Sequence, residues 1–168
     1  MRPYISKHVT YEEVIASSTA KKNNISNEPT PEHLENIKRL ASDLIEPLRL
    51  LVSVQRGVDT PLFFSSFYRS AELNKFLPGA SPTSKHKVGL AVDIDLDGMY
   101  PGFGNTELFK LLAKHRNLLA FDQLIWEYGD KSKPNWVHVG LTEIGTPFRN
   151  DVFAVFKGSS NSVKIDWI

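Results

Sequence analysis

The chain has 168 residues, of which 41% are hydrophobic and 23% are charged, a composition typical of a globular domain. Its 20 basic and 19 acidic residues give a formal net charge of +1, which disfavours binding to nucleic acid. No apolar run approaches the ~20 residues needed to cross a bilayer, and the absence of cysteine excludes disulfides, thiol catalysis and cysteine-bound zinc. We therefore predict a single domain over residues 1–168, a monomer that binds neither nucleic acid nor membranes.

The first 30 residues form a mostly polar segment. Thr10 is a good helix N-cap and is followed by Glu12 and Glu13, which predicts a short helix. The N-terminus lacks the apolar stretch of a secretory signal, so we expect no signal peptide and synthesis in the cytoplasm. Beyond this segment we expect a core over residues 31–141 and a C-terminal extension over residues 142–168.

A long amphipathic helix is predicted to open the core. Thr30 is a suitable N-cap and Pro31 suits the first helical position. Apolar residues then recur at a spacing of three and four as far as Leu48, which corresponds to about five turns. Pro47 is expected to kink this helix or to end it early. His33, in the first turn, is expected to face solvent.

Short helices and strands are predicted to follow. Apolar runs at residues 62–67 and 90–96 indicate two buried strands. Residues 121–128 and 135–141 are expected to pair as a hairpin with a longer loop. The other predicted elements are a short helix from residue 70, a helix over residues 105–115, and edge strands over residues 152–156 and 163–167. Together they predict an α+β fold, with helices on one side of a mainly antiparallel sheet.

The segment from Ser84 to Asp93 holds the most informative local pattern. His86 lies at the end of a loop, and Asp93 lies on the strand that follows. Gly89 allows the backbone to turn between them, and Ala91 leaves the sheet face beside Asp93 uncrowded. A loop histidine and a strand aspartate can then meet at one point. Alone, such a segment more often corresponds to a surface histidine followed by an ordinary polar strand.

The predicted hairpin carries two further polar residues in apolar surroundings. His138 lies within an otherwise apolar strand, and Glu127 lies at the end of its apolar partner strand. A histidine in a sheet is often structural, but a buried carboxylate requires a partner or a raised pKa. Two such exceptions on paired strands indicate a functional site.

These residues suit metal chemistry. Two imidazoles and one carboxylate, from His86, His138 and Asp93, make a catalytic zinc set that leaves a position open. Cobalt or manganese could occupy the same ligands. Glu127 is the candidate general base. Arg69, at the end of a buried strand, is the candidate cation for an oxyanion or a substrate carboxylate, unless it is an ordinary surface charge.

Other candidate ligands have simpler explanations. Residues 93–98 match the start of a calcium loop, but the position of its bidentate glutamate is Gly104. We therefore expect Asp95 and Asp97 to face solvent or to support the site indirectly. His115 falls in the last turn of a predicted helix, where histidine commonly interacts with the helix dipole.

The chain resembles the zinc D-Ala-D-Ala carboxypeptidase family, which includes vancomycin-resistance dipeptidases and phage L-alanyl-D-glutamate endolysins. The family's metal motif is similar to the pattern formed here by Ser84, His86, Gly89, Ala91 and Asp93. Its second histidine, in a Trp-x-His strand, is matched by Trp136 and His138. Residues 67–70 resemble the family's strand-end arginine segment, which implies a substrate-binding and catalytic role for Arg69. Ser84, in the first position of the metal motif, is likewise expected to contact substrate.

The position of the base departs from part of this family. Several members place a catalytic glutamate three residues before the last histidine, where this chain has Asn135. Residues 121–127 are instead similar to a segment of phage and bacterial members, and the hedgehog signalling domain, which shares the fold, has a similar spacing. The resemblance thus implies Glu127 as the base, on a hedgehog-like fold.

The resemblance implies a zinc-dependent peptidase that hydrolyses peptidoglycan stem peptides or other peptides containing D-amino acids. A phage enzyme released at lysis or carried in a virion would suit a chain without a signal peptide. Two alternatives remain: a non-catalytic zinc domain that binds a partner, and an intracellular D-Ala-D-Ala dipeptidase.

Overall fold

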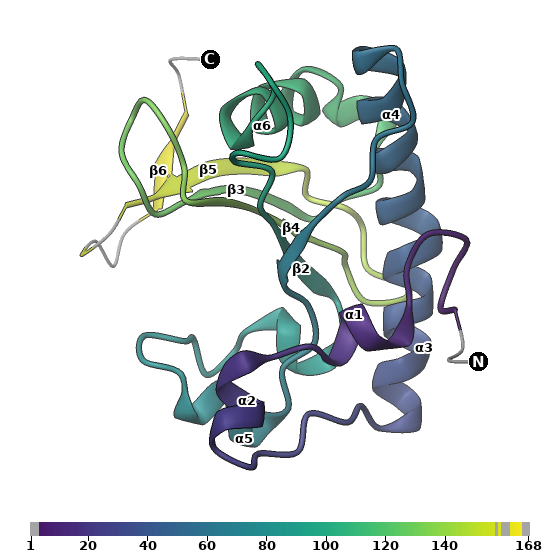
Figure 1. The fold of residues 1–168 in the computed structure, drawn as a ribbon, viewed down its shortest axis with the longest axis vertical. Helices are drawn as coiled ribbons and strands as arrows, with labels where there is room; N and C mark the ends of the chain where they lie inside the picture. Colours follow the sequence, from purple (N-terminus) through teal and green to yellow (C-terminus); the bar gives the residue numbers. More distant parts are fainter. Residues whose placement is uncertain (1–3, 157, 159–161, 166–168) are drawn as a thin grey trace.

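The computed structural model describes residues 4–156, 158 and 162–165. Figure 1 shows a curved sheet with α6 and the long helix made by α3 and α4 on its convex side and a group of short helices beyond one end. The helices are α1 (Tyr11–Ile15), α2 (Ser18–Lys22), α3 (Pro31–Leu40), α4 (Glu46–Arg56), α5 (Ala71–Phe76) and α6 (Asn105–Lys114). Other helical turns are the π-helical turn η1 (Ala41–Ile45) and the 3-10 turns η2 (Lys85–Val88) and η3 (Arg116–Leu118). The strands are β1 (Phe64–Ser66), β2 (Ala91–Ile94), β3 (Gln123–Glu127), β4 (Trp136–Gly140), β5 (Asp151–Val155) and β6 (Ser162–Lys164).

The six strands form one sheet in the order β1-β2-β4-β3-β5-β6. Every neighbouring pair is antiparallel except β3 and β5, which are parallel. The predicted α+β class with a mainly antiparallel sheet is confirmed. The expectation of an edge strand at residues 152–156 is wrong, because β5 lies inside the sheet between β3 and β6. Of the strand expected over residues 163–167, residues 166 and 167 lie outside the described residues.

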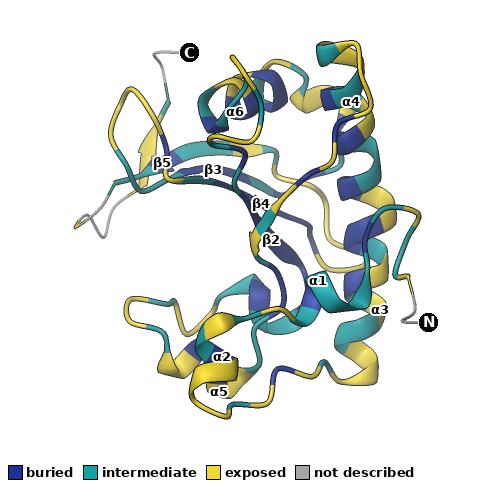
Figure 2. Ribbon diagram, viewed as in Figure 1, coloured by how far each residue is buried: buried dark blue, intermediate teal, exposed yellow. Residues whose placement is uncertain are grey.

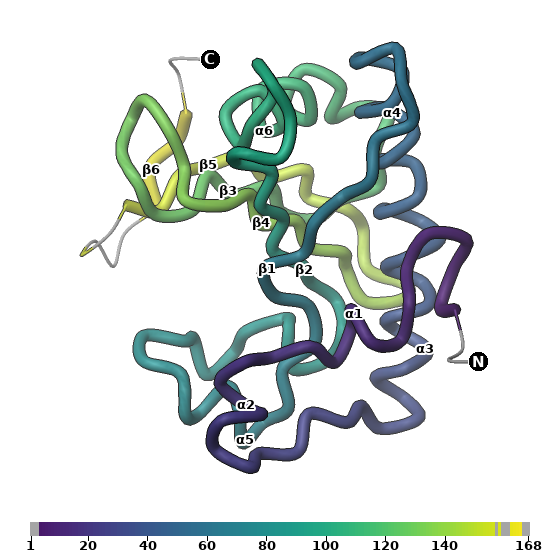
Figure 3. Tube along the Cα trace, in the orientation of Figure 1, coloured from purple at the N-terminus to yellow at the C-terminus, as the bar shows by residue number. Residues whose placement is uncertain are grey.

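The path of the chain from β4 to β5 explains why β3 and β5 are parallel. After β4 the chain runs out to α3, where the Arg39 guanidinium donates to the carbonyl of Thr142. It then comes back to begin β5 beside the start of β3, as Figure 3 shows. Asp151 N–H donates to the Asp122 carbonyl at 3.0 Å, which fixes the register of the returning strand.

The long helix of the core passes through Pro47 without ending. It begins at the predicted cap, where the Thr30 side chain accepts from the backbone of His33. Proline cannot donate to the preceding turn, and the helix adapts by widening into the π-helical turn η1 before it. It ends at Gly57, whose φ of 70° suits a glycine C-cap. The expectation that His33 faces solvent is wrong, because its half-buried ring lies 3.0 Å (Nδ1) from the Tyr68 hydroxyl.

The sheet separates the core from a polar face. Side chains alternate along each strand, so Val92, Val137 and Trp126 point toward the helices, where Phe109 of α6 packs edge-on against Trp126. Figure 2 shows this buried layer between the central strands and the helices. The next residues along these strands, Asp93 among them, point to the concave face. Among the described residues, no helix has the length and apolar character needed to span a bilayer.

Candidate metal centre

The His86 backbone is held by a short 3-10 turn between two fixed points. Turn η2 begins after Ser84 and ends at Gly89, whose φ is 75°. A β-carbon at Gly89 would lie 2.5 Å from Ile37 Cγ1 and 2.8 Å from the His33 carbonyl oxygen. Glycine therefore allows η2 to pack directly against α3 and to reverse the chain into β2. This geometry carries the His86 ring over the sheet.

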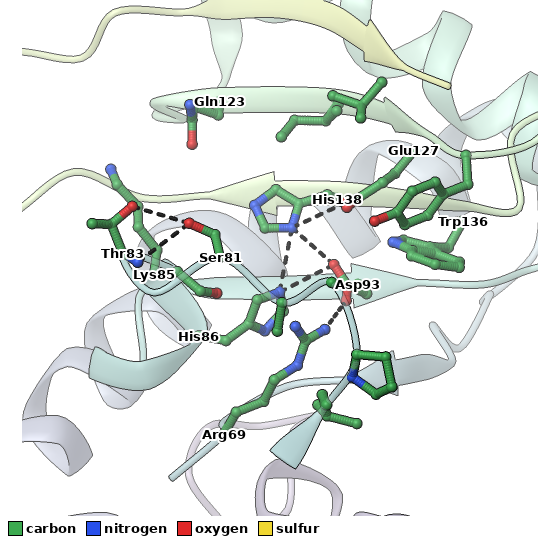
Figure 4. A pocket seen from close by; sticks show the side chains of 18 of the residues that line it. Arg69, Ser81, Thr83, Lys85, His86, Asp93, Gln123, Glu127, Trp136 and His138 are labelled. Carbon is green, nitrogen blue, oxygen red and sulfur yellow. Dashed lines mark hydrogen bonds and ion pairs between the residues drawn. The ribbon is translucent and has the colours of Figure 1, made fainter. Parts of the chain in front are cut away.

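Asp93 and His138 reach the same place through strand register. They are direct partners on the antiparallel strands β2 and β4, and His138 is also the partner of Ile125 on β3. Direct partners point to the same face of a sheet. Asp93 and His138 are therefore side by side on the concave face, next to the ring of His86 (Figure 4).

Three ligand-type atoms converge at this point. Asp93 Oδ1 lies 2.8 Å from His138 Nδ1 and 3.2 Å from His86 Nε2, and the two ring nitrogens are 3.3 Å apart. All three residues are buried. In a tetrahedral zinc site with bonds of ~2.0–2.1 Å, ligand atoms lie about 3.3 Å from one another. The observed spacing suits such an ion.

Further contacts fix two of the three side chains. His86 Nδ1 lies 2.5 Å from the carbonyl oxygen of Phe67, so Nδ1 carries the proton and Nε2 presents its lone pair to the centre. Arg69 Nη2 donates to Asp93 Oδ2 at 2.6 Å and Arg69 Nε donates to Ser66 Oγ at 2.8 Å. Asp93 thus keeps Oδ1 for the centre. Such supporting contacts are typical of metal ligands.

The protonation states of these groups decide which lone pairs face the centre. Burial lowers the pKa of His86, which keeps that ring neutral at neutral pH. Burial is the largest influence on His138 and opposes its charged form, but the hydrogen bond and charge of Asp93, together with the charge of Glu127, outweigh burial and raise the pKa. For Asp93 burial is likewise outweighed, here by the two imidazoles, and the pKa is lowered. Lone pairs of two rings and a carboxylate facing one another are the donor set of zinc, so these residues fit the metal.

Glu127 lies next to this centre on β3. Its Oε2 is 3.7 Å from His138 Nδ1, and the cross-strand partner of Glu127 is Trp136. Burial raises the pKa of Glu127, with a further contribution from the negative charge of Asp93. The buried Trp136 indole Nε1–H interacts with the Glu127 carboxylate, which opposes the rise in the pKa of Glu127, although the contact falls outside ordinary hydrogen-bond geometry. Asn135, where several resembling proteins have their base, is exposed.

A cavity of about 710 Å³ opens over these groups. Its walls include the three ligand-type residues, Arg69, Ser84 and Glu127. The structure thus brings together every residue predicted for the site. Ser84 makes no side-chain cap to η2, so its hydroxyl is available to a ligand. Arg69 borders the cavity, but its Nε and Nη2 are committed to Ser66 and Asp93.

Asp95 and Asp97 lie apart from the centre. Asp95 Oδ1 accepts from Asn105 Nδ2, and Asp97 Oδ1 accepts from the backbone of Asn105. Both carboxylates therefore anchor the start of α6. His115 is the C-cap of the same helix, as expected from its position in the last turn.

Sequence reasoning missed one ionic cluster on the cavity wall. Buried Asp122 accepts from Lys85 Nζ and from Arg149, whose Nε and Nη2 lie 2.8 and 2.7 Å from its two oxygens. The available signal was an acidic residue between Phe121 and the apolar strand β3, since a buried carboxylate needs partners. The partners were not predictable because Lys85 and Arg149 come from distant segments.

Comparison with known proteins supports the same interpretation. The chain matches the model of the Peptidase M15 family over residues 7–140. No curated protein sequence matches it. The matched range contains the three ligand-type residues, Arg69, Ser84 and Glu127, and it ends before Arg149. Because the match covers most of the chain, this protein belongs to the Peptidase M15 family of metallopeptidases.

Proposed function

We propose that the protein is a zinc-dependent peptidase that hydrolyses peptides of peptidoglycan, as a D-Ala-D-Ala carboxypeptidase or an L-Ala-D-Glu endopeptidase. The observation that carries this proposal is the convergence of His86, Asp93 and His138 at the base of an open cavity, with Glu127 beside them. The choice of peptidoglycan rests on the resemblance of residues 84–93 and 136–138 to enzymes of cell-wall peptides.

In this proposal His86 Nε2, Asp93 Oδ1 and His138 Nδ1 hold the zinc ion. Zinc supplies Lewis acidity, which makes water a stronger acid and polarises a carbonyl group. Glu127 accepts the proton of the attacking water and later delivers it to the leaving amine. Its burial suits both steps, because a carboxylate with a raised pKa is the stronger base.

Two donors on the cavity wall are suited to the substrate carbonyl. Arg69 contributes its positive charge beside Asp93, and its Nη1 has no partner among the described residues. The buried indole N–H of Trp136 lies beside the Glu127 carboxylate and makes no hydrogen bond of ordinary geometry to the described residues. Ser84 also lines the cavity, and its hydroxyl can bind the peptide backbone. A preorganised donor near the developing negative charge stabilises the transition state.

The proposal is tested with zinc-loaded protein on intact sacculi and on free D-Ala-D-Ala. We expect soluble fragments from sacculi, with new termini identified by mass spectrometry. Cleavage of the dipeptide alone would instead indicate the intracellular dipeptidase. A protein that binds zinc in proportion to its own concentration but cleaves neither substrate would be the non-catalytic binding domain, and the proposal would be rejected.

A further inference from the structure

The cavity has a second end, away from Glu127 and Trp136. Figure 4 shows His138 in the middle, with Glu127 and Trp136 on one side and Lys85, Ser81 and Thr83 on the other. Gln123 and Arg149 also line the cavity wall. The Gln123 amide has no hydrogen-bond partner among the described residues. None of the catalytic roles proposed above involves this end of the cavity.

The charged groups that face solvent at this end of the cavity are positive. Asp122 is only 3% exposed, whereas Lys85 is 26% and Arg149 is 53% exposed, so the two cations cover the carboxylate. Their hydrogen bonds lower the pKa of Asp122 to about 2, so its single negative charge neutralises only one of the two positive charges. Asp151 Oδ2 lies 3.5 Å from Arg149 Nη1, but Asp151 borders a separate groove and not this cavity.

Both cations retain unused donors. A lysine ammonium has three N–H groups, and Lys85 spends two of them on Asp122 and on the carbonyl of Leu141. Arginine has five, and Arg149 gives Asp122 one from Nε and one from Nη2. The pairing with Asp122 also fixes the direction of both side chains. This is a preorganised donor group for an anion, and a carboxylate is the form of anion that a planar guanidinium binds best.

The distance from the candidate metal centre suits a peptide group. A β-carbon at Gly140 would lie 3.7 Å from His138 Nε2 and 3.8 Å from Lys85 Cδ, so the lysine stem passes close to the histidine. Along β3, Gln123 and Glu127 each lie two residues from Ile125, the partner of His138. At ~3.3 Å per residue, this places the cationic end about two extended residues from the centre.

We propose that Lys85 and Arg149 form a carboxylate-binding subsite, so that the preferred substrate peptides carry a carboxylate within about two residues of the bond that is cleaved. This inference rests on the proposed peptidase function and adds the substrate class to it. It also gives the C-terminal extension a role, because Arg149 lies beyond the range matched by the family.

Two carboxylates of a stem peptide could occupy the subsite, and selective amidation separates them. The probe is acetyl-L-Ala-γ-D-Glu-L-Lys-D-Ala-D-Ala, compared with its C-terminal amide and with the form amidated on the D-Glu α-carboxylate. Titration calorimetry on chelator-treated, metal-free protein measures binding without turnover. We expect one amidation to weaken binding about tenfold, as for loss of a charge-assisted hydrogen bond. The amide that loses affinity identifies the carboxylate.

Variants then assign the effect to this cluster. Arg149→Gln should reduce the acid-to-amide preference below about threefold, and Arg149→Lys should keep part of it, because it retains the charge. Arg116→Gln, which removes an exposed arginine on η3, should leave it unchanged. If Arg149→Gln proves unfolded by circular dichroism, Lys85→Gln takes its place.

The outcomes separate the two proposals. Equal binding of all three peptides to the wild type, or a preference that survives in both Arg149→Gln and Lys85→Gln, would overturn the subsite. A tenfold preference in metal-free protein, with no hydrolysis after zinc is added, would support the subsite and reject the peptidase function. Hydrolysis of the acid and amide peptides with the same KM would support the peptidase function and reject the subsite.

Discussion

Two buried aspartates, Asp93 on the cavity wall and Asp122 beneath the wall residues Lys85 and Arg149, have opposite kinds of neighbour. Asp122 is surrounded by formal cations and accepts three side-chain hydrogen bonds from Lys85 and Arg149. Asp93 has Arg69 on one oxygen only, while its other oxygen faces the ring nitrogens of two histidines. Both carboxylates have lowered pKa values. Lys85 and Arg149 neutralise the charge of Asp122, whereas Asp93 Oδ1 faces two other lone-pair donors, the ring nitrogens of the histidines.

The difference distinguishes an anchor from a ligand site. A carboxylate satisfied by cations holds segments together, and Asp122 joins η2, the start of β3 and the C-terminal extension. A carboxylate oxygen that meets two imidazole nitrogens within 3.3 Å leaves lone pairs in excess of protons, which a divalent cation resolves. Substitutions at the two aspartates and their partners should therefore fail in different ways, one through metal content and the other through stability.

The largest expected effect is on metal binding. His86→Ala removes one of the three proposed zinc ligands, and we expect zinc content after dialysis to fall to a small fraction of one ion per chain. The stabilisation that zinc confers on thermal unfolding should disappear with it. Elemental analysis and a thermal melt with and without zinc measure both effects. His115→Ala, at the C-cap of α6, is the matched control and should keep a full zinc content; equal zinc in the two variants would contradict the assignment.

The next effect is on turnover. Glu127→Gln preserves shape but removes the proton acceptor, so we expect hydrolysis to fall by about 10²- to 10⁴-fold. Zinc content should stay at the wild-type level, because Glu127 lies outside the group of three ligand-type residues. Steady-state kinetics and elemental analysis on the same preparation provide the measurement. Glu143→Gln, at an exposed position, should show wild-type rates. Retained activity in Glu127→Gln would assign the base to another residue.

A smaller effect is expected at Arg69, which orients Asp93 from outside the centre. Arg69→Met removes the hydrogen bond to Asp93 Oδ2, and we expect zinc affinity to weaken about 10- to 100-fold, as for other residues that support a metal ligand. Competition with a chromophoric chelator measures this affinity. Arg69→Lys should recover part of the affinity through its charge. Unchanged zinc affinity together with a reduced kcat would instead give Arg69 a role only with substrate.

Much of the fold was predictable because local signals agreed with the final packing. The Thr30 cap, the apolar spacing of the long helix and the apolar runs of β2, β3 and β4 all matched elements of the structure. The passage of the helix through Pro47 was not predictable, because a π-helical turn depends on the packing of residues on both sides. The placement of β5 inside the sheet was also missed, since a parallel partner is chosen by tertiary contacts and leaves no short-range signal.

The residues of the candidate site also divide into those that were predictable from the sequence and those that were not. His86, Asp93 and His138 were predictable because each is polar within a buried or constrained segment and together they form a recognisable donor set. The commitment of Arg69 to Asp93 was not predicted, because strand-end position does not reveal which carboxylate a guanidinium will meet. The Lys85, Asp122 and Arg149 cluster was missed for a related reason: its members are ordinary charges in sequence and acquire meaning only when three segments meet.

The smallest predicted effect tests the anchor. The pKa of Asp122 is lowered to about 2 in the folded chain, so its charge contributes stability above its unfolded pKa, and this contribution is lost as the pH falls through about 4 toward 2. Asp122→Asn should therefore reduce the free energy of unfolding by about 1–2 kcal/mol at pH 7, since water around half-exposed Arg149 screens part of the interaction. In urea titrations, the difference from wild type should shrink as the pH is lowered from 5 to 3. Asp151→Asn, which removes an exposed carboxylate near the same arginine, should stay within about 0.5 kcal/mol of wild type throughout. A pH-independent loss in Asp122→Asn would mean that shape and not charge holds the extension in place, and zinc content in that variant should remain full because Asp93 is untouched.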